Sequence, residues 1–374
     1  MGSTERIRAM SPEMRPVAVE LDSGPIARSQ RQRFEQVRIT IVGAGAMGSL
    51  VAARLTQAMD SAADSPASDD AIERVLLYGR PSAHLDAIRS GGLRLSDLDG
   101  TDQTVAIETT SDPADVKGSD VVIVLVKAWA SAEIGETLRP YLTRESIVLT
   151  LQNGLGNAAA LRTSLLDKGV RPHVWLGVTT QAAIRPAPGV LVHTGTGITA
   201  IGRRTTMNDR VRALASTLDV PNWRTVAVED IHRWVWRKLA VNCAINPLTA
   251  LSGLPNAAIA SDPGLREAAN RLAAEVVAVA NAQRIALELG DVTSAIEDVA
   301  IATGANHSSM LVDLESGQRT EIDAINGAVV NEGRRLGIPT PANDLMATLV
   351  RARESAVAGA SANAAPQEAE SAAV

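Results

Sequence analysis

Three polar residues recur at every fourth position within the otherwise largely apolar segment 231–248. They are Lys238, Asn242 and Asn246, separated mostly by Leu, Ala, Val and Ile. Residues four apart share one face of an α-helix, so the spacing predicts a polar stripe on a helix. A solvated helix face would give the same spacing, but the apolar neighbours favour a stripe that lines a cleft. Pro247 follows at once and predicts that the helix ends there, with Asn246 near its terminus.

These side chains are suited to the reduction of a ketone. A lysine ammonium can stabilise the oxyanion that develops on a carbonyl and can donate a proton to it. The amides of Asn242 and Asn246 can hold a substrate, because they both donate and accept hydrogen bonds. His193 and His232 lack partners by pattern, and we interpret each as a surface residue or a satisfied one. The hydride would have to come from a nicotinamide cofactor.

A glycine-rich segment could hold that cofactor. It has the pattern G-x-G-x-x-G, follows a β-branched run that starts at Val37, and precedes a helical pattern, which is the context of a dinucleotide-binding loop. The first glycine permits a tight turn, the second lets the backbone approach a pyrophosphate, and the third lets helix and strand pack closely. A purely structural glycine turn is the alternative. The residues expected to bind the cofactor here are Gly43, Ala44, Gly45, Ala46, Met47 and Gly48.

The residues after the second strand indicate which nicotinamide cofactor is used. An NAD site usually places a carboxylate there to hold the ribose 2′-hydroxyl, but residues 78–82 read Tyr-Gly-Arg-Pro-Ser. Arg80 offers a fork of donors to a 2′-phosphate, although it could also be an ordinary surface arginine. The segment therefore favours NADPH. Lys127 and Asn153 follow later strands and are placed to contact the cofactor, because the carboxyl ends of parallel strands meet at one edge; each could also be an ordinary loop residue.

Two further candidates lie in the segment 306–323. Ser309 is a candidate hydroxyl ligand, and Glu321 is a candidate partner for the substrate or the nicotinamide ribose. Farther on, Asn326-Gly327 is a dipeptide typical of hairpin turns, but the surrounding apolar residues have helical spacing, so we expect a helix.

The elements that must position these residues divide the chain of 374 residues into two domains. Strand-like runs alternate with helical patterns over 36–228, which predicts an α/β Rossmann domain with a doubly wound sheet. Helical patterns alone cover 229–352 and predict an all-α substrate and catalytic domain. Residues 1–35 and 353–374 are expected to be a disordered extension and tail, and 60–71 a surface insertion. The expected strands begin at Val37 and then cover 75–78, 119–129, 146–156, 173–184 and 197–203; the expected helices cover 231–248, 262–289, 291–303 and 317–336.

Composition narrows the classes of protein that fit. The formal net charge of −6 argues against a nucleic-acid partner, because phosphate binding needs clustered Lys and Arg. No apolar run approaches the roughly 18 residues that span a bilayer, so no membrane partner is expected. The single cysteine, Cys243, excludes a disulfide framework within the chain and indicates a reducing, cytoplasmic location. No metal site is expected, and the sequence leaves a homodimer open.

Taken together, these motifs resemble those of the ketopantoate reductase (2-dehydropantoate 2-reductase) family. The similar segments occur in the same order and span about residues 37 to 350. The Lys–Asn–Asn stripe and the segment 320–330 are the most distinctive of them. The segments are GAGAMG at 43–48, VLVKAW at 124–129, QNGLG at 152–156, GVTTQAA at 177–183, WRKLAVNCAINPLTAL at 236–251, SSMLVDL at 308–314 and TEIDAINGAVV at 320–330.

The resemblance implies reduction of a small 2-keto acid by NADPH, with Lys238 as the general acid. It implies a helical domain like the C-terminal domain of 6-phosphogluconate dehydrogenase, with catalysis in the cleft between the domains. It also assigns the remaining roles: substrate contacts to Asn153, Asn242, Asn246, Asn256 and Ser309, and cofactor contacts to residues 43–48, Arg80, Lys127, Asn153, Ala183 and Glu321. Two alternatives stay open: a reductase of another branched 2-keto acid, and an NADP(H)-binding sensor without catalysis.

Overall fold

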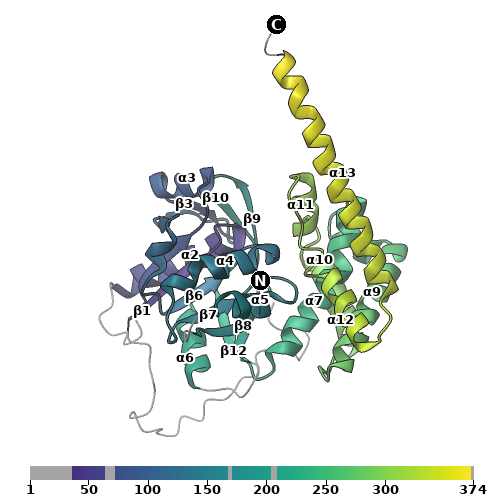
Figure 1. The fold of residues 1–374 in the computed structure, drawn as a ribbon, viewed down its shortest axis with the longest axis horizontal. Helices are drawn as coiled ribbons and strands as arrows, with labels where there is room; N and C mark the ends of the chain where they lie inside the picture. The colour runs from purple at the N-terminus through teal and green to yellow at the C-terminus, as the bar shows by residue number, and fades with distance from the viewer. Residues whose placement is uncertain (1–35, 64–71, 167–170, 204–208, 372–374) are drawn as a thin grey trace. The chain divides into compact units, whose positions relative to one another are not determined.

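The computed structural model describes residues 36–63, 72–166, 171–203 and 209–371, with side chains up to 357, and the chain forms two compact units (Figure 1). Of the described residues, the first unit takes those up to Val126, then Ala130–Gln152 and Ala158–Ile231. The second takes Lys127–Trp129, Asn153–Asn157 and everything from His232 on. Two short loops of the N-terminal half therefore belong to the helical unit. The expected extension over 1–35 lies outside the described residues.

The first unit is built on a sheet of eight strands in the order β12-β11-β8-β7-β6-β1-β2-β5. Neighbouring strands are parallel except β8 and β11, which are antiparallel. β1 lies between β2 and β6, so the strand order reverses beside it, and ligands of such sheets bind at that point. The expected α/β Rossmann domain is confirmed. The strands are β1 (Val37–Val42), β2 (Ile72–Tyr78), β5 (Glu108–Thr110), β6 (Val121–Val124), β7 (Ile147–Thr150), β8 (His173–Thr179), β11 (Ile198–Gly202) and β12 (Arg224–Ala227).

The central strands are apolar because both faces of the sheet are covered. Every residue of β6 and β7 is buried, which explains their continuous Val, Ile and Leu runs. The expected insertion over 60–71 begins inside a helix, since α2 runs to Ala63, and its remainder lies outside the described residues. The helices of this unit are α2 (Ala46–Ala63), α3 (Ala83–Gly91), α4 (Ser131–Leu138), α5 (Asn157–Ser164) and α6 (Asp209–Leu218), with 3₁₀ turns at Pro113–Val116 and Arg139–Tyr141. A further 3₁₀ turn, Ala128–Ala130, begins in the loop that belongs to the second unit.

A second sheet of four strands, in the order β4-β3-β10-β9, was not expected. The run 173–184, predicted as one strand, is in fact β8 followed by the start of β9, which enters this other sheet. The small sheet is hard to recognise in the sequence because β3 and β4 are short and half polar. Its strands are β3 (Leu93–Ser96), β4 (Asp102–Val105), β9 (Ala182–Ala187) and β10 (Val190–Gly195).

The second unit contains only helices among its described residues, as predicted. The expected helix over 317–336 forms only in its second half: α12 starts at Asn326, and the residues before it form turns and loop. The expected disordered tail is also corrected: α13 continues through residues 353–371. No described helix is both long and apolar enough to cross a membrane. The helices are α7 (Ile231–Ser252), α8 (Ala257–Ser261), α9 (Pro263–Ala282), α10 (Leu289–Ala302), α11 (Ser309–Glu315), α12 (Asn326–Leu336) and α13 (Pro341–Ser371).

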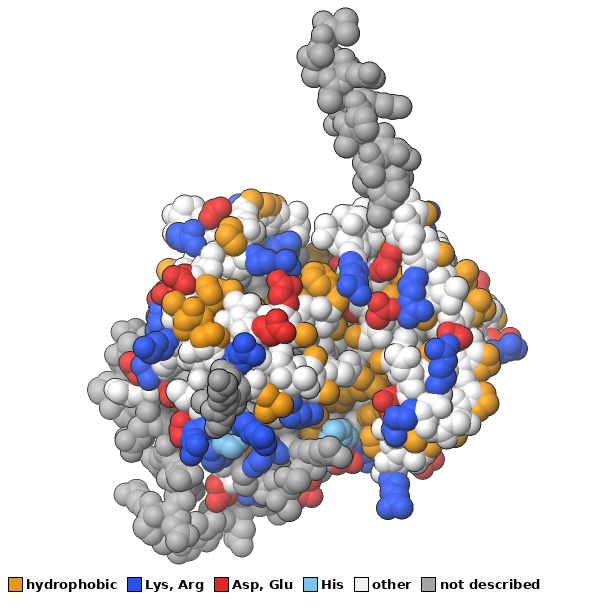
Figure 2. All heavy atoms as spheres, viewed as in Figure 1, with side chains coloured by type: hydrophobic (Ala, Val, Ile, Leu, Met, Phe, Trp, Pro, Cys, Tyr) orange, Lys and Arg blue, Asp and Glu red, His pale blue; other side chains and the backbone are white. Residues whose placement is uncertain are grey.

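The surface of both units carries charges of either sign. On the face drawn in Figure 2, Lys and Arg side chains are interspersed with Asp and Glu on each unit. This mixed pattern fits the net charge of −6.

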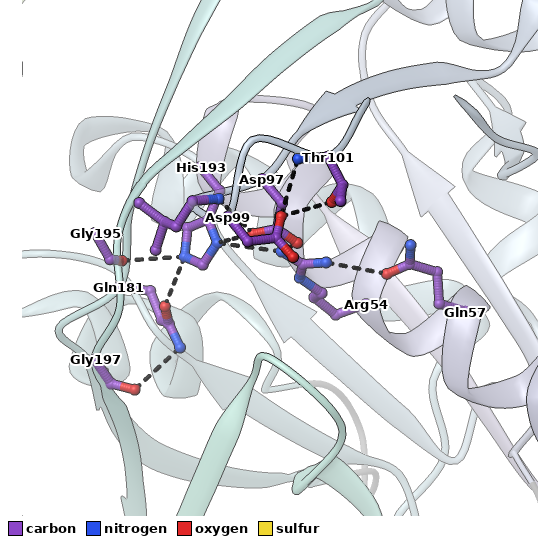
Figure 3. Close-up of polar contacts among 10 residues, drawn as sticks. Arg54, Gln57, Asp97, Asp99, Thr101, Gln181, His193, Gly195 and Gly197 are labelled. Atoms are coloured by element: carbon purple, nitrogen blue, oxygen red, sulfur yellow. Dashed lines mark hydrogen bonds and ion pairs between the residues drawn. The ribbon is translucent and has the colours of Figure 1, made fainter. Parts of the chain in front are cut away.

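A buried polar cluster ties helix α2 to the second sheet (Figure 3). The Arg54 guanidinium, 1% exposed, lies 2.6 Å from Asp97 Oδ2. His193 Nδ1 lies 2.9 Å from Asp97 Oδ1, and its Nε2 lies 3.0 Å from Gln181 Oε1 and 3.1 Å from the Gly195 carbonyl oxygen. His193 is thus a buried and satisfied residue, one of the two readings the sequence left open. Burial alone would raise the pKa of Asp97, but hydrogen bonds from His193 and Arg54 bring it below its usual value.

Replacing Asp97 should destabilise the first unit. Asp97→Asn leaves the Arg54 charge buried without its carboxylate, which typically costs ~3–5 kcal/mol of unfolding free energy. Urea denaturation at pH 7 would measure this loss, with Asp86→Asn in the exposed pair with Arg89 as the control, expected within ~1 kcal/mol of the wild type.

The loss of unfolding free energy in Asp97→Asn should depend on pH, and it should be larger at neutral pH than in acid. The pKa of Asp97 is lower in the folded state than in the unfolded state, so its contribution is present above about pH 4 and is lost as the pH falls through the folded-state value. The gap between wild type and Asp97→Asn should therefore narrow in acid. A loss at pH 7 no larger than that of the Asp86 control would contradict the role of this ion pair.

Candidate active site

The glycine loop between β1 and α2 is shaped by contacts that exclude side chains. Gly43 has φ +115°, and a Cβ placed on it would lie 2.8 Å from the Leu125 carbonyl carbon and the Val126 nitrogen. Its N–H donates to the Tyr78 carbonyl oxygen at 2.9 Å. The loop is thereby held at the carboxyl ends of β2 and β6, on either side of β1, where the strand order reverses.

The rest of the loop leaves room for a phosphate. A Cβ on Gly45 would meet no atom within 4 Å, so the backbone there can be approached closely, whereas a Cβ on Gly48 would lie 1.9 Å from the Gly43 carbonyl oxygen. α2 starts at Ala46, so its free N–H groups and positive dipole end face the same place. These residues fit a dinucleotide.

Two other expected cofactor residues lie in the same unit. Arg80 is exposed and follows β2 after Gly79. Ala183, on β9, packs against the core cluster that Ala44, Ala46 and Met47 also contact. Ala183 and the glycine loop therefore share one hydrophobic core, and the roles of Arg80 and Ala183 in cofactor binding stay predictions.

Within the second unit, Lys238 belongs to a chain of polar contacts. Its Nζ donates to Asn153 Oδ1 at 2.7 Å, and Asn153 Nδ2 donates to Glu321 Oε2 at 3.3 Å. The other carboxylate oxygen of Glu321 accepts from the Ala128 backbone N–H at 2.9 Å. Glu321 is only 7% exposed. We call this set, Lys238–Asn153–Glu321, the lysine relay.

Burial and the Glu321 carboxylate act in opposite directions on the charge state of Lys238. Burial lowers the pKa of Lys238 to about 8, and the Glu321 carboxylate opposes that shift by favouring the charged form. The ammonium is thus mostly protonated at neutral pH, but it releases its proton far more readily than an exposed lysine does. A lysine in this state can act as a general acid.

A close backbone approach holds Asn153 beside Glu321. The next residue, Gly154, has φ +79°, and a Cβ on it would lie 2.3 Å from the Ala324 carbonyl oxygen. That same oxygen accepts from the Leu155 N–H at 2.8 Å. Only glycine fits at 154, which explains why the asparagine precedes a glycine in the segment 152–156.

The helix that carries Lys238 does not end at Pro247, contrary to the prediction: α7 continues to Ser252. Proline lacks an N–H, so the carbonyl four residues earlier, that of Cys243, loses its helical partner. Asn326 Nδ2 replaces it with a donation at 3.1 Å, and also donates to Asn343 Oδ1 at 2.9 Å. Asn343 is held in turn by Glu275, which accepts from its N–H and Nδ2. A buried side chain thus compensates for the proline.

Asn242 and Asn246 share the helix face of Lys238, as predicted. Asn242 is half-buried and Asn246 is 8% exposed. Among the described residues, neither side-chain amide makes a hydrogen bond. Both amides therefore keep their donors and acceptors for a ligand.

Two expected substrate residues are not brought to the relay by any contact in the described part of the chain. Asn256 Nδ2 donates to Thr303 Oγ1 at 2.9 Å, and its backbone N–H donates to the Asn306 carbonyl. Ser309 is exposed at the start of α11. The buried neighbour Ser308 accepts from Thr249 Oγ1 at 2.8 Å, so it links α11 to α7. Their roles in substrate binding stay predictions.

Lys127, expected to contact the cofactor, forms an ion pair that the sequence did not suggest. Its Nζ lies 2.6 Å from Asp313 Oδ2. Burial raises the pKa of Asp313, although Lys127 opposes this. The one signal available was a carboxylate inside the mostly apolar helix α11.

Comparisons with known proteins agree with this arrangement. Residues 39–205 match the family described as Ketopantoate reductase PanE/ApbA, and residues 230–354 match Ketopantoate reductase PanE/ApbA C terminal. A 2-dehydropantoate 2-reductase of Halobacterium salinarum is 35% identical over 84% of this chain and 98% of its own length. A 2-dehydropantoate 2-reductase of Archaeoglobus fulgidus is 34% identical over 85% of this chain and 98% of its own length.

Solved structures give the same result. A PanE/ApbA family ketopantoate reductase from Ralstonia eutropha is 32% identical, with a TM-score of 0.73 over 86% of this chain and 99% of that one. D-mandelate dehydrogenase, solved with NADH and anilino(oxo)acetate, shares the fold with a TM-score of 0.76. The match covers 86% of this chain and 99% of that one, at 23% identity. On the family matches and the curated relatives together, this chain belongs to the ketopantoate reductase family and is an oxidoreductase.

Proposed function

We propose that the protein reduces 2-dehydropantoate (ketopantoate) to pantoate with NADPH, in the cytoplasm, as a step of pantothenate and coenzyme A synthesis. The relatives' names support the substrate. The observation that carries the chemistry is Lys238, whose Nζ donates to Asn153 Oδ1 at 2.7 Å and whose pKa is lowered to about 8. The free buried thiol of Cys243 fits a reducing compartment.

Lys238 is assigned the proton transfer. As the keto carbon is reduced, negative charge develops on its oxygen, and a nearby ammonium both stabilises that charge and donates the proton. Asn153 orients the ammonium by accepting one of its hydrogen bonds, and Glu321 fixes Asn153 in turn. The amides of Asn242 and Asn246 have the donors and acceptors needed to hold the carboxylate and hydroxyl groups of a small 2-keto acid.

The cofactor assignment is NADPH. When bound, NADPH supplies the hydride. The glycine loop and the start of α2 offer N–H groups to its pyrophosphate, and Arg80 offers a fork of donors to its 2′-phosphate. No carboxylate occupies residues 78–82 to hold a free 2′-hydroxyl.

Another small branched 2-keto acid is the alternative substrate. Asn242 and Asn246 would hold the keto-acid end that all such substrates share, so they do not select the side chain. A sensor that binds NADP(H) without catalysis is disfavoured by the relay, because binding alone needs no buried acid.

The substrate is tested by following NADPH consumption at 340 nm with ketopantoate and a panel of 2-keto acids that differ in their side chains. Ketopantoate is expected to give the highest kcat/KM. Faster turnover of another keto acid would replace it as substrate, and tight NADPH binding without turnover of any would favour the sensor.

Removing the amine should abolish proton transfer while sparing the cofactor site. Lys238→Ala is expected to lower kcat by ~10²–10⁴, the usual worth of a positioned acid, with little change in the Kd for NADPH. In the wild type, kcat should fall as the pH rises through about 8, where Lys238 loses its proton. The control is Lys117→Ala, an exposed lysine of the first unit. Turnover that survives in Lys238→Ala would remove this residue from the mechanism.

The Glu321 carboxylate should raise the pKa of Lys238. Glu321→Gln removes the charge that favours the ammonium, so the pKa of Lys238 should drop below about 8 and the alkaline limb of kcat should shift to lower pH. An NMR titration of labelled lysine Nζ measures this directly. Glu315→Gln, at an exposed position of α11, is the matched control. An unchanged titration in Glu321→Gln would rule out this coupling.

A further inference from the structure

One arginine outside the segments discussed so far reaches the glycine loop. Arg185 lies on β9, and its Nη1 donates to the Ala44 carbonyl oxygen at 3.2 Å. The side chain is exposed, and among the described residues this is its only hydrogen bond. A guanidinium has five N–H donors, so most of them remain available beside a loop that fits a dinucleotide.

The position of Ala44 shows which part of the loop Arg185 reaches. A Cβ on Gly79 would lie 3.0 Å from Ala44 Cβ and 3.4 Å from Ala44 N, so Ala44 lies against the end of β2, next to Arg80. In a dinucleotide fold the ribose 2′ position lies at the end of the second strand. The pyrophosphate belongs farther along, at the start of α2. Arg185 is therefore on the ribose side of the loop.

The charge of Arg185 also acts on a residue at the start of α3. His84, on α3, has a pKa lowered to about 4, by burial first and by the Arg185 charge second. His84 Nδ1 accepts from the Gly189 N–H at 2.9 Å, which ties α3 to the turn between β9 and β10. The hydrogen bond to Ala44 and the electrostatic effect on His84 both indicate that Arg185 lies near residues 79–82, since Ala44 lies against Gly79 and α3 begins at Ala83.

The charge of Arg185 has no anionic partner in the described part of the chain. It forms no ion pair with a carboxylate there, and His84, whose pKa its charge helps to lower, is neutral at pH 7. A fork of donors that is not committed to a carboxylate is suited to a phosphate.

We propose that Arg185 and Arg80 together bind the 2′-phosphate of NADPH, so that two arginines rather than one select NADPH over NADH. This inference rests on the proposed use of NADPH. The competing explanation is that Arg185 only stiffens the glycine loop through the Ala44 carbonyl. The two differ in a measurable way, because a stiffened loop helps NADPH and NADH equally.

The test is isothermal titration of the full-length protein with NADPH and with NADH, so that binding is measured apart from turnover. Arg185→Ala should raise the Kd for NADPH by about 10–100-fold, the usual worth of a charge-assisted contact, and change the Kd for NADH by less than about 3-fold. Arg185→Lys keeps the charge but loses the fork of donors, so its Kd for NADPH should lie between those of the wild type and Arg185→Ala. Arg94→Ala removes an exposed arginine of the same sheet, on β3, and should change neither Kd.

The outcomes separate the two proposals. Equal weakening of NADPH and NADH in Arg185→Ala, or no change in either, overturns the role of Arg185 while leaving NADPH as the cofactor. A wild-type protein that binds NADH as tightly as NADPH overturns both. The double variant Arg80→Ala/Arg185→Ala should bind the two cofactors alike, and a preference for NADPH that survives in it would overturn the two-arginine site.

Discussion

The proposed chemistry depends on keeping the ammonium of the half-buried Lys238 charged at neutral pH. Burial alone drives a lysine toward its neutral form, and the pKa of Lys238 falls accordingly to about 8. What limits the fall is the Glu321 carboxylate, placed one asparagine away. Each member of the relay comes from a different part of the chain, so the second unit must bring three segments together to make one functional group.

Separate devices hold those segments. The loop with Asn153 is fixed by the close approach of Gly154 to Ala324, which follows Glu321 by three residues. α7 is fixed by Asn326, whose side-chain amide donates to the Cys243 carbonyl oxygen. Pro247 has no N–H and leaves that oxygen without a donor from the helix itself. Because Asn326 begins α12 directly after the turn that carries Glu321, one buried side chain links the helix of the acid to the loop of the carboxylate. The proline can therefore be interpreted as part of how the site is built.

Sequence patterns predicted the parts of this molecule that depend on local periodicity. The glycine loop after β1, the polar face of α7 and the all-helical second unit follow from spacings that physical rules connect directly to structure. The effect of Pro247 was missed, because it depends on Asn326 and the distance between the two cannot be read from the chain. The second sheet was missed for a related reason: β3 and β4 are four residues each, and only the pairing of β3 with β10, far along the sequence, joins them to the rest of the sheet. Asp313 stood out only as a carboxylate in a mostly apolar helix, which does not name its partner Lys127, and Arg185 carried no local signal of its contact with Ala44.

The two lysines of the second unit show why an amide belongs in the relay. Lys127 contacts Asp313 directly, with 2.6 Å between Nζ and Oδ2, and a direct ion pair favours the charged form of both partners. Lys238 instead meets a neutral amide oxygen at a similar distance, and its carboxylate acts only through space beyond that amide. A direct carboxylate would hold the proton more strongly, and no carboxylate at all would let burial remove it. An asparagine between the two keeps the ammonium oriented and charged while leaving its proton free to be transferred.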